Sequence, residues 1–144
     1  MSTNLYEHDF YDWANTQAAL LRSGKLEAAD IENIAEEIES MGKGERRELE
    51  NRLVVLLLHL LKWQFQPERR GKSWRATIRI QRRDLSLHLR RNPSLAPKID
   101  EAVAYAHGNA IIEASAETDL PDETFPQTCA WTFDQIMDAE FWPG

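Results

Sequence analysis

The sequence contains a single cysteine, Cys129, among its 144 residues. One thiol cannot close a disulfide within the chain, and it cannot supply a cysteine-rich zinc cluster. We interpret Cys129 as a small, buried apolar residue rather than as a nucleophile. Disulfide-stapled and zinc-ribbon folds are therefore excluded.

Long apolar runs are also missing. The longest, Leu53–Leu58, has six residues, whereas a membrane-spanning helix needs roughly 18 or more. The first residues do not have the basic and apolar pattern of a signal peptide. We expect a soluble, cytoplasmic protein with no membrane partner.

No stretch alternates apolar and polar residues with a period of two, so no β-sheet is predicted. The chain also lacks internal repeats. Its length is that of one domain, and its 42% apolar residues, together with five tryptophans, can fill a core. We therefore expect a single all-helical domain, 1–144.

The strongest helical pattern lies at residues 45–66, ERRELENRLVVLLLHLLKWQFQ. Its apolar residues form two neighbouring stripes, which merge into an arc of about 220° at roughly 100° per residue. One neighbouring helix cannot cover so wide an arc. This segment is therefore predicted to be a central helix that is covered on more than one side.

Four further helices are predicted, at 6–23, at 30–41, at 73–91 and from Ser94 onward. Gly42 and Gly44 interrupt the pattern, so helices 30–41 and 45–66 are expected to form a tight antiparallel pair. After Asp119, prolines and aromatic residues predict a tail (119–144) over the bundle, with a short helix near Phe133–Met137. The predicted fold is all-α: a compact bundle of about five main helices with this tail packed on it.

Charge is strongly segregated within the net charge of −7. Residues 62–91 hold 10 basic and 2 acidic side chains, whereas residues 92–144 hold 1 basic and 10 acidic. The basic residues of the fourth helix suggest a ridge that could bind nucleic acid, with one tryptophan stacking on a base. The candidate residues are Arg75, Arg79, Arg82, Arg83, Arg90 and Trp74. The alternative, which we favour, is that the ridge pairs with acidic residues of the same chain, such as the Glu-rich second helix.

His59 is the titratable residue of most interest, because it lies midway along the central helix on its polar strip. Together with Glu36, Glu37 or Glu39, it could serve as an acid, a base or a ligand. The alternative is a histidine at the edge of the core that bonds a backbone or carboxylate oxygen, and we favour this interpretation.

No metal or cofactor site is predicted. The four histidines are scattered, and none belongs to a Glu-x-x-His or His-Glu-x-x-His element. A metal site assembled from separate helices stays open.

Several short segments carry a family resemblance when taken together: YEHDFYDWA (6–14), EEIESMG (36–42), ERRELENRL (45–53), HLLKWQ (59–64), SWRATI (73–78), NPSL (92–95) and FPQTC (125–129). Through them the chain resembles the bacterial domain of unknown function 29 family over almost its whole length. The resemblance implies an all-helical bacterial protein, and it implies no reaction, cofactor or catalytic residue.

The sequence thus favours a binding or protein–protein interaction module without catalytic activity, whose partner is another protein or a second copy. Three alternatives stay open: nucleic-acid binding through helix 73–91, an enzyme built on His59 and a glutamate with or without a metal, and one member of a toxin–antitoxin-like pair.

Overall fold

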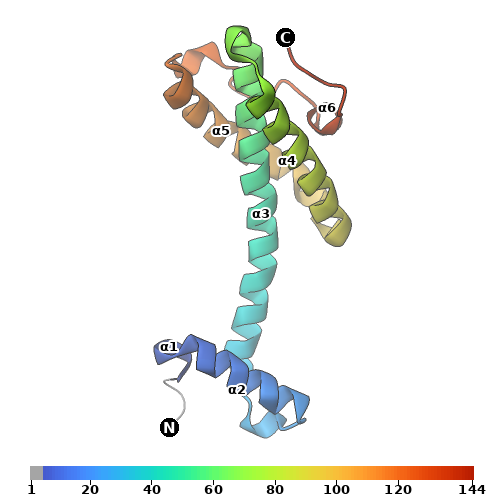
Figure 1. The fold of residues 1–144 in the computed structure, drawn as a ribbon. Coiled ribbons are helices and arrows are strands. Elements are labelled where there is room, and N and C mark those ends of the chain that lie inside the picture. Colours follow the sequence, from blue (N-terminus) through green and yellow to red (C-terminus); the bar gives the residue numbers. More distant parts are fainter. Residues whose placement is uncertain (1–4) are drawn as a thin grey trace. The chain divides into compact units, whose positions relative to one another are not determined.

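A computed structural model describes residues 5–144, and within that range the chain forms helices and loops without a strand. The all-α prediction is therefore confirmed (Figure 1). The chain divides into two compact units, residues 1–44 and 45–144, which are described in turn. The longest helix, α3 (Ile31–Phe65), contributes residues to both units.

The course of α3 corrects one prediction. The backbone stays helical through Gly42 and Gly44, so the expected antiparallel pair of helices 30–41 and 45–66 does not form. A glycine costs a helix about 1 kcal/mol relative to alanine but does not forbid it. The turns that follow are supported by the i,i+4 pairs of Arg46 with Glu50 and of Glu48 with Arg52.

The N-terminal unit comprises α1 (Leu5–His8), α2 (Phe10–Arg22), the 3₁₀ turn η2 (Leu26–Ala28) and the first turns of α3. The predicted helix 6–23 is divided at Asp9, whose side chain accepts a hydrogen bond from the Asp12 backbone N–H as the N-cap of α2. At the other end, Gly24 follows α2 with φ of +72°, as expected of a glycine after a helix.

Asp30 joins the two helices of this unit. Its Oδ2 accepts hydrogen bonds from Trp13 Nε1 at 3.0 Å and from Asn33 Nδ2 at 2.8 Å. Its own backbone N–H donates to Gln17 Oε1 at 2.7 Å. The hydrogen bonds from Asn33 and Trp13 favour the carboxylate and hold the pKa of Asp30 below its usual value.

The C-terminal unit contains the rest of α3, α4 (Lys72–Arg91), α5 (Ile99–Thr118) and α6 (Phe133–Met137), joined in part by the 3₁₀ turns η3 (Pro67–Arg69), η4 (Pro93–Lys98) and η5 (Asp122–Thr124). The fifth helix begins later than predicted, because residues 93–98 form η4. Pro97 lies inside η4 and has no backbone N–H to donate.

The core of the C-terminal unit is built on the leucine-rich part of α3. Its fully buried side chains are Leu49, Leu53, Leu56, Leu57, Leu60 and Leu61. Ile78 and Leu85 of α4 and Ile136 of α6 complete this core, together with a buried alanine at every fourth position of α5 from Ala102 to Ala114. The central helix is therefore covered by more than one element, as predicted (Figure 1).

The tail packs on this core. Phe125 is buried with its ring centroid 5.1 Å from that of Phe65, and the rings of Trp142 and Trp63 lie 4.7 Å apart. The short helix predicted near Phe133–Met137 is α6. Among residues 5–144, no helix combines the length and the apolarity that crossing a membrane requires.

Candidate functional site

An apolar groove lies between α2 and the first turns of α3 in the N-terminal unit. Its volume is about 460 Å³. The side chains that line it include Phe10, Ala14, Ala18 and Leu21 of α2 and Ile38 and Met41 of α3. This groove was not predicted, because helix 30–41 was expected to pack against helix 45–66 as an antiparallel pair.

Large apolar side chains along the groove are open to solvent. Ile38 is 62% exposed and Met41 is 69% exposed, while Phe10 and Leu21 are about half exposed. Isolated apolar residues on a surface are ordinary, but a contiguous set that lines a groove marks an interaction site. The groove is therefore the first candidate functional surface.

The N-terminal unit that contains the groove is acidic. Residues 5–44 hold nine acidic and three basic side chains. Glu37 lines the groove and accepts a hydrogen bond from the Tyr6 hydroxyl, which raises the pKa of Tyr6 to about 12. The groove is thus an apolar surface in an acidic unit, and one carboxylate, that of Glu37, is part of its lining.

The predicted basic ridge of α4 includes one residue that is buried. The Arg82 side chain donates from Nε to the Ile136 carbonyl and from Nη2 to the Phe141 carbonyl, each at 2.8 Å. Its guanidinium carbon lies 5.3 Å from the centroid of the Trp142 ring, and burial lowers the pKa of Arg82. Arg82 therefore holds the tail in place and faces away from solvent.

Two other members of the predicted ridge, Trp74 and Arg75, also make contacts within the C-terminal unit. The Lys62 ammonium lies 5.0 Å from the centroid of the Trp74 ring and 2.7 Å from a Glu117 oxygen. Arg75 lies over the rings of Trp63 and Trp142. Trp74 is half-buried, so it offers less of its ring to a base than the sequence suggested.

Arg79, Arg83 and Arg90 are exposed on α4, and Arg83 makes only a 3.4 Å contact with the neighbouring Asp84. Over residues 5–144, no ion pair or hydrogen bond involves the side chain of Arg79 or Arg90. The basic outer face of α4 is thus real, although it is narrower than the sequence predicted.

His59 is half-buried, and its Nδ1 lies 2.8 Å from the Val55 carbonyl oxygen. Burial lowers the pKa of His59. None of the ion pairs found in residues 5–144 involves this ring. Glu36 and Glu37 belong to the N-terminal unit, in which Glu37 accepts a hydrogen bond from the Tyr6 hydroxyl.

A second histidine lies in a cluster that sequence reasoning missed. His88 of α4 is 6% exposed, and its Nδ1 lies 3.6 Å from an oxygen of Glu45 and 3.6 Å from an oxygen of Glu48, both on α3. These three residues are the group within the described chain whose donor atoms are close enough to hold a metal ion. The i,i+3 spacing of the two glutamates was the available signal, but the histidine is far away in sequence.

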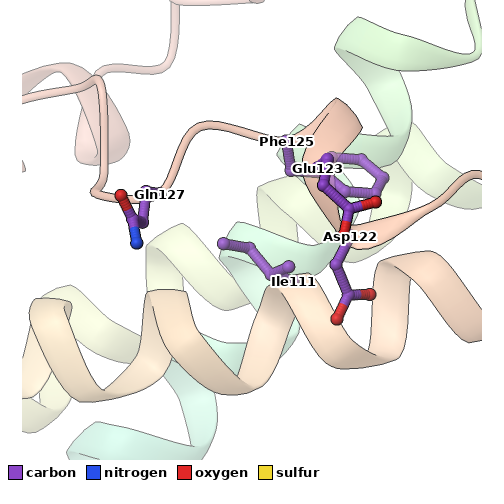
Figure 2. A pocket seen from close by; sticks show the side chains of 5 residues that line it. All are labelled: Ile111, Asp122, Glu123, Phe125 and Gln127. Carbon is purple, nitrogen blue, oxygen red and sulfur yellow. The ribbon is translucent and has the colours of Figure 1, made fainter.

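An open pocket of about 530 Å³ lies between α5 and the tail (Figure 2). Ile111 and Phe125 supply apolar surface there, and Asp122, Glu123 and Gln127 supply polar groups. In Figure 2, Ile111 rises from α5 toward the segment that carries the other four residues.

Cys129 is half-buried, and its thiol donates to the Trp131 carbonyl oxygen at 3.5 Å. Burial raises the pKa of this thiol, which lowers the fraction of nucleophilic thiolate. These contacts agree with a structural role.

The fold and its surfaces define an all-helical protein with an apolar groove in its acidic N-terminal unit and a basic outer face on α4. A family model described as a domain of unknown function, DUF29, matches residues 5–142. The chain therefore belongs to this family, as the sequence segments predicted. No curated protein and no solved structure matches the chain.

Proposed function

We propose that the protein is an interaction module whose N-terminal unit binds one amphipathic, basic helix of a partner protein. The observation that carries this proposal is the exposed apolar groove between α2 and α3. A bacterial, cytoplasmic setting is part of the same proposal.

The shape of the groove supports a helix as the occupant. Ala14 and Ala18 stand one turn apart in the middle of the α2 wall, with the larger Phe10 and Leu21 toward its ends. Small side chains let a neighbouring helix approach closely, and large ones pack on either side of its ridges. Grooves between two helices commonly bind the apolar face of a third.

The charges support a basic partner over a second copy. Two N-terminal units brought together would each carry an excess of acidic over basic residues, nine against three in residues 5–44. Like charges across an interface disfavour it, whereas a partner with Lys and Arg beside its apolar face gains attraction and a faster encounter.

The proposal is tested with two synthetic helical peptides of about five turns. They share one leucine-rich face and differ only in flanking residues, which are lysine and arginine in one and glutamate in the other. We expect the full chain to bind the basic peptide with a micromolar Kd, and the acidic peptide at least about tenfold more weakly. Raising salt from about 50 to about 200 mM should weaken the basic complex.

The matched variants are Ile38→Glu, in the groove, and Leu26→Glu, which is 57% exposed on η2 of the same unit. Ile38→Glu should weaken the basic complex at least about tenfold, while Leu26→Glu should leave it nearly unchanged. Equal binding of both peptides would contradict the proposal. So would a dimer in light scattering that Ile38→Glu dissociates, because the groove would then belong to a second copy.

The exposed arginines of α4 favour a second candidate function, nucleic-acid binding by that helix. Arg79, Arg83 and Arg90 leave their charges toward solvent, which suits phosphate contacts. The enzyme built on His59 and the toxin–antitoxin-like pair stay hypotheses from the sequence.

A further inference from the structure

We propose that Glu45, Glu48 and His88 bind a divalent transition-metal cation in the C-terminal unit. Two ligands come from successive turns of α3 and the third from α4. The proposal concerns a site separate from the groove, and neither depends on the other.

The distances fit a small ion. The three donor atoms lie within 4.8 Å of one another, and both histidine-to-carboxylate distances are 3.6 Å. Ligands at about 2.0–2.2 Å from a tetrahedral zinc ion stand about 3.3–3.6 Å apart. The cluster therefore needs little rearrangement to close on a metal.

The orientation of His88 points to a cation between the three groups. Its Nε2 lies 2.8 Å from the Glu45 backbone carbonyl, so that nitrogen carries a proton and donates it. In the neutral ring, the Nδ1 lone pair then faces the oxygens of Glu45 and Glu48. A lone pair beside two carboxylates is repulsive unless a positive charge lies among them. A ligating histidine typically donates its other N–H to a carbonyl or carboxylate in this way.

Neighbouring side chains hold the two carboxylates. Arg52 Nε donates to Glu48 at 2.9 Å, and Asn92 Nδ2 donates to Glu45 at 3.2 Å. The positive charge of Arg52 competes with a metal, but Asp84 lies 3.2 Å from the same guanidinium and offsets it. Hydrogen bonds of this kind orient ligating carboxylates.

The site has room for a further ligand. A pocket of about 240 Å³ is lined in part by Glu48 and His88 and reaches Arg91. The glutamates remain accessible, with side chains 48% and 43% exposed. One imidazole with two carboxylates suits Zn²⁺, Co²⁺, Mn²⁺ or Fe²⁺, whereas Mg²⁺ and Ca²⁺ prefer oxygen ligands alone.

The alternative to a metal is a proton on Nδ1, which would make His88 an imidazolium paired with both carboxylates. Titration of the tag-free full chain with Zn²⁺, followed by calorimetry, distinguishes the two. We expect one Zn²⁺ per chain with a Kd near or below about 10 µM. Titration with Co²⁺ should give the intense visible absorption of a tetrahedral site. Mg²⁺ should not compete with Zn²⁺ or Co²⁺ for binding.

The double variant Glu45→Gln/Glu48→Gln keeps the side-chain shapes and should lower Zn²⁺ affinity at least about 100-fold. Its matched control is Glu50→Gln/Glu101→Gln, which removes the two carboxylates paired with Arg46 and should change affinity less than about twofold. Circular dichroism checks that both variants are folded. Absence of Zn²⁺ binding at about 100 µM, or binding equally strong in both variants, would overturn the proposal.

Discussion

Arg82 has a structural role that its residue type does not suggest. Arginine is usually exposed, and the sequence placed Arg82 on a basic ridge. Its position between Ile78 and Leu85, four residues after one and three before the other, already put it on the buried face of α4. The sequence did not predict which two tail carbonyls accept hydrogen bonds from Arg82, because they lie more than 50 positions further along the chain.

Substitution of Arg82 tests this role. Arg82→Met keeps the apolar stem but leaves the Ile136 and Phe141 carbonyls without their donor. Hydrogen bonds to a charged donor contribute about 1.5–3 kcal/mol each, so we expect the loss of two to lower the free energy of unfolding by about 3–6 kcal/mol. Urea denaturation measures the change. Arg83→Met, at a side chain that is 72% exposed, serves as control and should cost less than about 0.5 kcal/mol. Equal effects of the two substitutions would contradict a structural role for Arg82.

At the scale of elements, the helices were predicted well where the helical spacing of apolar residues continues over several turns. α4 begins one residue before its predicted start and ends as predicted, and the leucine-rich half of α3 is buried as expected. The error concerned where one helix ends and the next begins. Gly42 and Gly44 resemble a turn, but glycine only permits a break, and good helix formers around it can carry the helix through.

Replacing these glycines tests the continuity of α3. A Cβ added at Gly42 or Gly44 meets no atom within 4 Å, and neither residue has a positive φ. Gly42→Ala and Gly44→Ala should therefore each raise the free energy of unfolding by about 0.5–1 kcal/mol, because alanine loses less entropy in a helix. The control is Gly24→Ala, where φ is +72° and the same change should destabilise. If Gly42→Ala and Gly24→Ala destabilise alike, residues 42–44 form a turn after all.

At the scale of the whole chain, apolar periodicity predicted the class of fold and the order of charged residues showed the segregation of charge, but neither predicted which charges stay free of partners. The groove was missed because a stripe of apolar residues predicts burial without saying what covers it. The cluster of Glu45, Glu48 and His88 was missed because His88 contacts the Glu45 carbonyl across 43 positions of sequence. Such contacts depend on how α3 and α4 pack, and a single sequence does not encode that in any local pattern.

The basic face of α4 offers the test at this scale. With Arg79, Arg83 and Arg90 exposed, a complex with single-stranded RNA or duplex DNA would involve up to about three phosphates. We then expect fluorescence anisotropy to show weak binding at about 50 mM salt, with log K against log salt falling at a slope of about −2 to −3. Arg79→Glu/Arg83→Glu should lower the affinity at least tenfold, by roughly 1.4 kcal/mol or more. Arg22→Glu/Lys25→Glu makes the same change in net charge in the N-terminal unit and should have a small effect if α4 is the binding surface. No binding by the unmodified chain at about 50 mM salt would eliminate nucleic acid as a partner, since phosphate contacts are strongest at low ionic strength.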